Sequence, residues 1–223
     1  MNILLILEGS EEKTLYDIFE NKGFSNKFVV RAENVEGSGN IAPYFQSEIS
    51  NEYYDCIICV YDVDNRINEK KSPYNKVRSA LKEVLLSDDR VDAVSVCTNP
   101  NVAQFFLLGA DKLSKVSLNS TSKTANTTLL NKYWPEIGNK KSYTAAAWQL
   151  DIIKNSFLYG PYSIETLLVN AEELDLDYKQ KNPASNLLPL FKALIDGDID
   201  YFTKAIAAKE MEELIYVDIT RKE

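Results

Sequence analysis

The sequence predicts an α/β fold, in which a four-stranded parallel sheet flanked by helices is followed by a mostly helical C-terminal extension. Over residues 1–112, short hydrophobic runs alternate with segments of helical character. Each connection is about twenty residues long, which is enough for a helical crossover between parallel strands. After Gly109 mostly helical patterns take over. We therefore expect a domain over 1–112 and an extension over 113–223 that packs on it, the two forming one compact unit.

The individual elements follow from hydrophobic runs, capping residues and turn residues. Ser10 is the expected N-cap of the first helix, and Pro73 suits the first turn of the third. The stretch 118–128 is rich in Ser, Thr and Asn, which is typical of a loop. We expect strands at 2–7, 28–31, 55–61, 91–97 and 214–219. In the N-terminal half we expect helices that begin at Ser10, Ile41, Ser72 and Asn99. In the C-terminal half we expect helices over 141–157, 163–174, 183–195 and 199–208.

Composition excludes several classes of function. No apolar run approaches the roughly 20 residues of a membrane span, and the start lacks the basic region of a signal peptide, so we expect a cytoplasmic protein. The chain contains no His, which excludes Ser-His-Asp and Cys-His catalysis. Cys56, Cys59 and Cys97 lie in strand-like runs, and we expect reduced core residues there and no zinc site.

Basic residues are concentrated in two segments, although the formal net charge is −8. The segment 66–82 holds six Lys or Arg and one Glu, and the segment 112–141 holds six Lys and one Glu. Positive charge mixed with aromatic rings suits single-stranded nucleic acid. The alternatives are a solvated helix face for the first segment and a core position for Trp134. The candidate nucleic-acid-binding residues are Arg66, Lys123, Lys140 and Lys141.

Carboxylates follow two of the predicted strands at the point where each strand ends. Glu8 follows the first strand, and Asp62 and Asp64 follow the third. Glu12 lies one helical turn after Glu8. Because the carboxyl ends of parallel strands share one edge, these acids can converge on a hard cation such as Mg²⁺ or Mn²⁺. The local alternatives are that the aspartates cap the next segment and that Glu8 only opens a helix.

Several motifs together resemble a known family. Three of them, in this order, resemble the Toprim domain of topoisomerases, primases and OLD-family nucleases: Leu7-Glu8-Gly9-Ser10-Glu11-Glu12, Gly37-Ser38-Gly39-Asn40-Ile41 and Tyr61-Asp62-Val63-Asp64. Two more resemble RloB-like proteins: Thr98-Asn99-Pro100 leading into Phe105-Phe106-Leu107-Leu108, and Asn182-Pro183-Ala184-Ser185 before an apolar helix. The first three motifs cover the N-terminal half, and the other two extend the match across most of the chain.

The resemblance implies a metal-dependent phosphodiester nuclease that cleaves RNA or DNA, with tRNA among the candidates. Such nucleases are effectors of bacterial anti-phage systems and work alongside an ATPase partner. The resemblance makes Glu8 a metal ligand or general base and Glu12 a supporting ligand. It makes Asp62 and Asp64 metal ligands for Mg²⁺ or Mn²⁺. Asn99 would organise the sheet edge beside the scissile phosphate.

The chain departs from the RloB-like pattern at two places. Ala103 stands where the family has a Glu, and the family's His after that helix is missing. A second interpretation is therefore a catalytically impaired subunit that binds or regulates within an ATPase-containing defence complex. A third is a small-molecule phosphotransferase on a flavodoxin-like sheet, which predicts a closed pocket and no affinity for polynucleotide.

Overall fold

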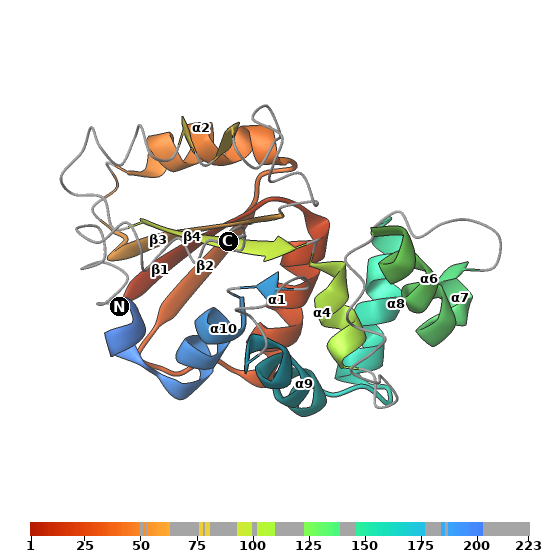
Figure 1. Ribbon diagram of the computed structural model, residues 1–223. Coiled ribbons are helices and arrows are strands. Elements are labelled where there is room, and N and C mark those ends of the chain that lie inside the picture. Colours follow the sequence, from red (N-terminus) through yellow and green to blue (C-terminus); the bar gives the residue numbers. More distant parts are fainter. Residues whose placement is uncertain are drawn as a thin grey trace.

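A sheet with helices on both faces forms the centre of the computed structural model (Figure 1). The structure describes residues 1–49, 51, 53–62, 76–77, 79–80, 93–99, 102–109, 123–138, 146–176, 184–185 and 187–202. The five strands of the described sheet, in the order in which they lie side by side, are β2 (Val29–Asn34), β1 (Asn2–Leu7), β3 (Cys56–Asp62), β4 (Ala93–Asn99) and β5 (Ala184–Ser185).

Strands β1 to β4 run parallel, and the short β5 is antiparallel to β4. Leu7 lies opposite Asn34 on one side and Val60 on the other, and Asp62 lies opposite Thr98. The carboxyl ends of β1, β3 and β4 therefore share one edge of the sheet. The expected parallel α/β sheet flanked by helices is confirmed. The antiparallel β5 was not expected, because its residues fall where the sequence predicts the start of a helix.

The apolar run of β1 explains why this strand lies in the middle of the sheet. Its side chains alternate between two buried clusters, as the period of a strand requires. Ile3, Leu5 and Leu7 belong to the larger cluster, and Leu4 and Ile6 belong to the smaller one. A strand with both faces buried is typical of a parallel sheet.

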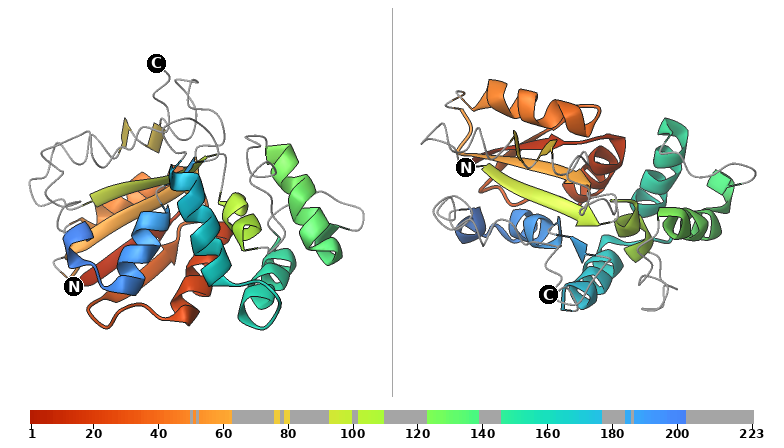
Figure 2. Two further views of the ribbon diagram at one scale, coloured as in Figure 1. Left: turned by 60° about the horizontal axis from the view of Figure 1, so that its bottom comes forward. Right: turned by 45° about the horizontal axis from the view of Figure 1, so that its top comes forward.

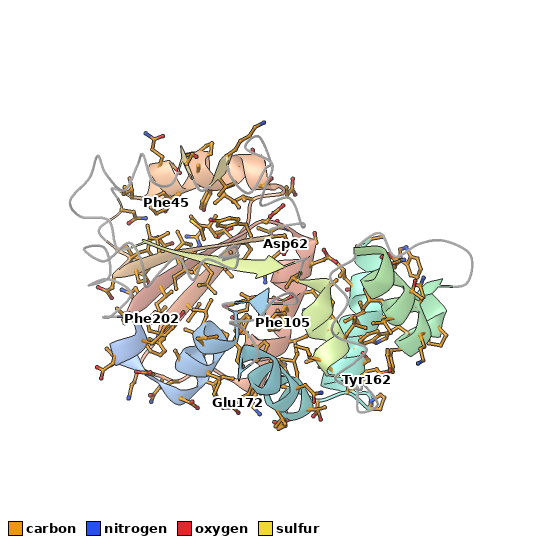
Figure 3. All side chains as sticks on the ribbon, viewed as in Figure 1. Phe45, Asp62, Phe105, Tyr162, Glu172 and Phe202 are labelled. Atoms are coloured by element: carbon orange, nitrogen blue, oxygen red, sulfur yellow. The ribbon has the colours of Figure 1, made fainter. Side chains whose placement is uncertain are left out.

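The described helices lie on both faces of the sheet (Figures 1 and 2). Helix α2 lies on one face, where Phe45 belongs to the smaller cluster, and α1, α9 and α10 lie on the other, where Phe202 belongs to the larger cluster (Figure 3). Helices α4, α6, α7 and α8 gather beside the end at which β4 finishes. The bounds are α1 (Ser10–Lys22), α2 (Ser38–Glu48), α4 (Ala103–Leu108), α6 (Lys123–Tyr133), α7 (Pro135–Gly138), α8 (Ala147–Leu158), α9 (Ile164–Leu176) and α10 (Leu187–Asp196).

The described part of the C-terminal extension contributes to the same apolar cluster as the sheet. Phe191 of α10 stacks on Phe19 of α1, with ring centroids 4.1 Å apart and planes 5° from parallel. On α8, Lys154 Nζ lies 2.6 Å from Asp17 Oδ2 of α1. Trp134 is 1% exposed, and its indole N–H donates to Ser156 Oγ at 2.7 Å, so this ring is a core residue.

Several expected boundaries differ from the structure. Gly9 is the N-cap of α1, and Ser10 is its first helical residue. The expected loop 118–128 is helical from Lys123 onward, because α6 begins there. The helix expected from Pro183 begins at Leu187, after β5. The helix expected from Ser72 lies largely outside the described residues, and the strand expected at 214–219 lies entirely outside them.

Among the described helices, none is long and apolar enough to cross a membrane.

Phe191→Ala tests whether α10 and the sheet unfold together. We expect it to lower the free energy of unfolding by about 3–5 kcal/mol, because it removes a buried ring that stacks on Phe19. Urea unfolding followed by far-UV circular dichroism and by tryptophan fluorescence measures this, and both signals should change in one coincident transition. Val169→Ala is the control, since Val169 is exposed and should change stability by less than about 0.5 kcal/mol. Two separate transitions in the wild type would contradict a shared core.

Candidate functional site at the carboxyl edge of the sheet

Three of the candidate residues follow or end strands at the same edge. Glu8 comes directly after β1, and its backbone N–H continues the ladder by donating to Val60 O at 3.0 Å. Asp62 is the last residue of β3, and Asn99 is the last residue of β4, where it pairs with Ala184 of β5. The topology therefore places these three positions along one edge, as the motif pattern predicts.

The structure brings Glu8 and Asp62 together. The backbone N–H of Asp62 donates to Glu8 Oε2 at 2.9 Å. One oxygen of Asp62 is also held, since the backbone N–H of Val102 donates to Asp62 Oδ1 at 2.9 Å. Val102 stands immediately before α4, so the start of that helix is fixed against the end of β3. Figure 3 shows Asp62 at this end of the sheet, close to α1 and α4.

Two helices begin beside these carboxylates. Helix α1 starts two residues after Glu8, and the N-cap of α2, Gly37, donates its N–H to the backbone oxygen of Glu8 at 2.6 Å. Gly37 has φ 132° and ψ 150°, a backbone conformation that side chains with a Cβ rarely adopt, so glycine is required there. Asn40 Nδ2 donates to Val35 O at 2.8 Å and closes the turn. The glycine-containing motif thus docks the start of α2 against the candidate site.

Glu12 lies in the first turn of α1 and is 5% exposed. Burial and, to a smaller degree, the charges of Glu11 and Glu8 raise the pKa of the Glu12 carboxyl from an ordinary 4.5 to about 8. Backbone N–H groups of Glu12 and Gly9 donate to this carboxyl and oppose the rise in its pKa. Glu12 is the third helical residue after the N-cap Gly9, and its carboxyl accepts from the Gly9 N–H. This contact is one of the two hydrogen bonds of a capping box. Glu12 therefore has a structural role at the start of α1, independent of any metal.

The described carboxylates do not by themselves complete a metal site. Among the residues that the structure describes, no group of three or more Asp, Glu or Cys side chains is arranged to hold a metal ion. Glu8 and Asp62 carry carboxylate oxygens at the ends of adjacent strands, and oxygen is the type of ligand that Mg²⁺ and Mn²⁺ prefer. Glu12 does not join them as a third member. The remaining predicted ligand, Asp64, lies outside the described residues.

Most of the candidate nucleic-acid-binding residues lie outside the described part of the chain. This applies to Arg66, Lys140 and Lys141. Lys123 is the first residue of α6, and only its backbone is described. Phe105 and Phe106 of α4 are buried in the larger cluster and are core residues.

Sequence reasoning missed the backbone donors of this edge. The N–H groups of Val102 and Gly37 hold Asp62 and Glu8, and neither residue type signals such a role. The only signal in the sequence was indirect: Gly37 lies in a glycine motif after a strand, and Val102 follows Asn99-Pro100 at the start of a helix.

No protein-family model, curated protein or solved structure matches the chain. The resemblance to Toprim and RloB-like proteins therefore rests on the short motifs and stays a prediction.

Glu12→Gln tests the buried carboxyl. The folded protein keeps the Glu12 proton up to about pH 8, whereas the unfolded chain releases it near pH 4.5. Wild-type stability should therefore fall as the pH rises through this window, by at most about 1.4 kcal/mol per pH unit. Gln keeps an acceptor oxygen without the charge, so the variant should be more stable than the wild type at pH 7 by roughly 3 kcal/mol. Below pH 4.5 this source of difference disappears.

The measurement is urea unfolding at a series of pH values from about 4 to about 9, in the presence of a metal chelator. Glu136→Gln is the matched control, because Glu136 is exposed in the short helix α7. Parallel curves of stability against pH for wild type and Glu12→Gln would contradict the raised pKa.

Proposed function

We propose that this chain is a metal-dependent phosphodiester nuclease of the Toprim type, acting on RNA or DNA. The observation that carries the proposal is the contact between Glu8 and Asp62, in which Asp62 N–H donates to Glu8 Oε2. It sets the acids of two Toprim-like motifs next to each other at the edge where open α/β sheets bind ligands.

Glu8 and Asp62 would hold a divalent cation, with Asp64 as a third ligand, while Glu12 would support the site by capping the start of α1 next to Glu8. A bound Mg²⁺ or Mn²⁺ polarises a phosphoryl oxygen and lowers the pKa of a coordinated water. The backbone donors on Glu8 and Asp62 fix both carboxylates in place before any ligand arrives, which reduces the cost of ordering them. In the alternative form of the proposal, Glu8 is the general base that accepts the proton of an attacking water. Asn99 ends the neighbouring strand beside them.

The start of α2 supports a phosphate substrate. The partial positive charge at a helix N-terminus favours anions. The first turn of α1 is already occupied by Glu11 and Glu12, whereas the first turn of α2 contains no acid. Gly39 and Asn40 of α2 are exposed, so a phosphate of a polynucleotide can approach there. We assign the flanking phosphates to Arg66, Lys123, Lys140 and Lys141.

The biological setting of the proposal comes from the resemblance alone. The resemblance implies that the nuclease is an effector of a bacterial anti-phage system and works in the cytoplasm with an ATPase partner. RNA, including tRNA, is favoured only because some Toprim effectors in defence act on it.

A second candidate function is a catalytically impaired Toprim-like subunit that binds nucleic acid or regulates an ATPase-containing complex. Ala103 favours it, since it is the first residue of α4, is 2% exposed and stands where the RloB-like pattern has a Glu. A buried methyl group at this place supplies no ligand or acid next to Asp62.

Asp62→Asn tests the proposed chemistry. Asn keeps an oxygen that can accept from Val102 N–H but removes the charge, so cleavage should fall by about 100-fold or more while the fold persists. The assay is cleavage of labelled tRNA and single-stranded DNA by the full chain with Mn²⁺ or Mg²⁺. Thermal melting reports the fold.

Asp55→Asn is the matched control, because Asp55 precedes β3 at the opposite end of the same strand and accepts from the Asn2 N–H at 2.7 Å. It should cleave like the wild type. The result that would overturn the nuclease proposal is binding without cleavage. If both the wild type and Asp62→Asn bind the same nucleic acids independently of metal and cleave neither, the second candidate function is favoured.

A further inference from the structure

Strand β2 is an outer strand of the sheet, with β1 as its neighbour and no described strand on its other side (Figure 2). Val29 N–H donates to Met1 O at 2.9 Å, and Val35 N–H donates to Leu7 O at 3.0 Å. Backbone groups in a strand alternate in direction, so the groups of odd-numbered residues face β1. The N–H and C=O groups of Val30, Ala32 and Asn34 therefore face outward.

The two faces of β2 have different surroundings. Val30 and Ala32 pack against the larger apolar cluster, on the side of α1. Val29 and Arg31 point to the other side and are exposed, Val29 by 56%. Arg31 Nε lies 2.6 Å from Glu33 Oε1 on this same side, so the exposed face of β2 carries one positive and one negative charge, two residues apart.

One outward carbonyl is only weakly used within the chain. The Tyr16 hydroxyl lies 3.5 Å from Val30 O, but the same hydroxyl donates to Glu20 Oε1 at 2.7 Å. A tyrosine hydroxyl has one hydrogen, and the shorter contact takes it. Val30 O therefore keeps the capacity to accept a hydrogen bond from another strand.

The order of side chains along this edge is self-complementary. On the face away from α1 lie Val29, Arg31, Glu33 and Val35, of which Val29 and Arg31 are exposed. Glu33 and Val35 are partly buried, and Val35 packs against the smaller apolar cluster. The backbone groups between them face outward at Val30, Ala32 and Asn34. If two such strands meet antiparallel with Ala32 opposite Ala32, each Arg31 lies opposite a Glu33 and each Val29 opposite a Val35. These four pairs are all at non-hydrogen-bonded positions, where side chains are closest.

We propose that β2 is an interaction surface for a second copy of this chain, which pairs with it antiparallel about a two-fold axis at Ala32. The outward groups of Ala32 then exchange two hydrogen bonds with those of its copy, and Val30 pairs with Asn34 in both directions. Isologous pairing of this kind closes after two copies.

Charge complementarity favours a second copy over a foreign strand. Charged side chains on an outer strand usually prevent pairing, because a partner strand sets like charges or unpaired charges against them. Here the antiparallel copy is the arrangement that opposes Arg31 to Glu33 at both positions. The carboxyl ends of the two sheets would point in opposite directions, so each copy would keep a separate candidate site with its own Glu8 and Asp62.

The test is sedimentation velocity of the full chain at loading concentrations from about 1 to about 200 µM. The wild type should show a monomer–dimer equilibrium. Arg31→Glu and Glu33→Arg should each weaken the dimer by about tenfold or more, because each change places like charges opposite each other twice. Circular dichroism melting of each variant reports whether the monomer is still folded.

Two further samples separate this interface from a merely structural effect. A mixture of Arg31→Glu chains with Glu33→Arg chains should form heterodimers, because every cross-strand pair is again opposite in charge. The double variant Arg31→Glu with Glu33→Arg should dimerise like the wild type. A wild type that stays monomeric throughout, or a dimer unaffected by either single change, would overturn the proposal. So would single variants that weaken the dimer but do not recover on mixing.

Discussion

The hydrogen bond from Asp62 N–H to Glu8 Oε2 is the contact on which the candidate site depends. It joins the ends of two adjacent parallel strands through a side chain, at the point where the regular ladder finishes. The bond follows from the register, since Leu7 lies opposite Val60 and the next residues along each strand are therefore neighbours. A one-residue slip of β1 would turn the Glu8 side chain to the other face of the sheet and break the contact. The buried alternation of β1 prevents such a slip.

The site combines several negative groups with fixed donors. Glu12 keeps its proton at neutral pH because it is buried and lies near Glu11 and Glu8. Glu8 and Asp62 each accept a backbone N–H at the ends of neighbouring strands. Glu12 is instead buried in the first turn of α1, where its carboxyl accepts from the backbone of Gly9. This difference in position favours a capping role for Glu12 and makes Glu8 and Asp62 the principal ligands of the proposed cation.

The sequence predicted the parallel sheet well because hydrophobic runs and crossover lengths determine it locally. It also placed Glu8, Asp62 and Asn99 on one edge, since parallel strands share their carboxyl ends. The predictions from the sequence were wrong where tertiary contacts determine the local structure. Ala184 and Ser185 pair with β4 although their neighbours suggest a helix, and Lys123 begins a helix within a segment of loop-like composition. The donors Gly37 and Val102 act through backbone atoms, which no residue type signals.

The most direct test of the central claim is a crystal structure of the full chain soaked with Mn²⁺, with anomalous diffraction used to locate the ion. The account predicts one strong anomalous peak about 2.0–2.3 Å from carboxylate oxygens of both Glu8 and Asp62. The account would be contradicted if, at saturating Mn²⁺, no anomalous peak lay at these two side chains. A peak found only at another place on the surface would contradict it as well.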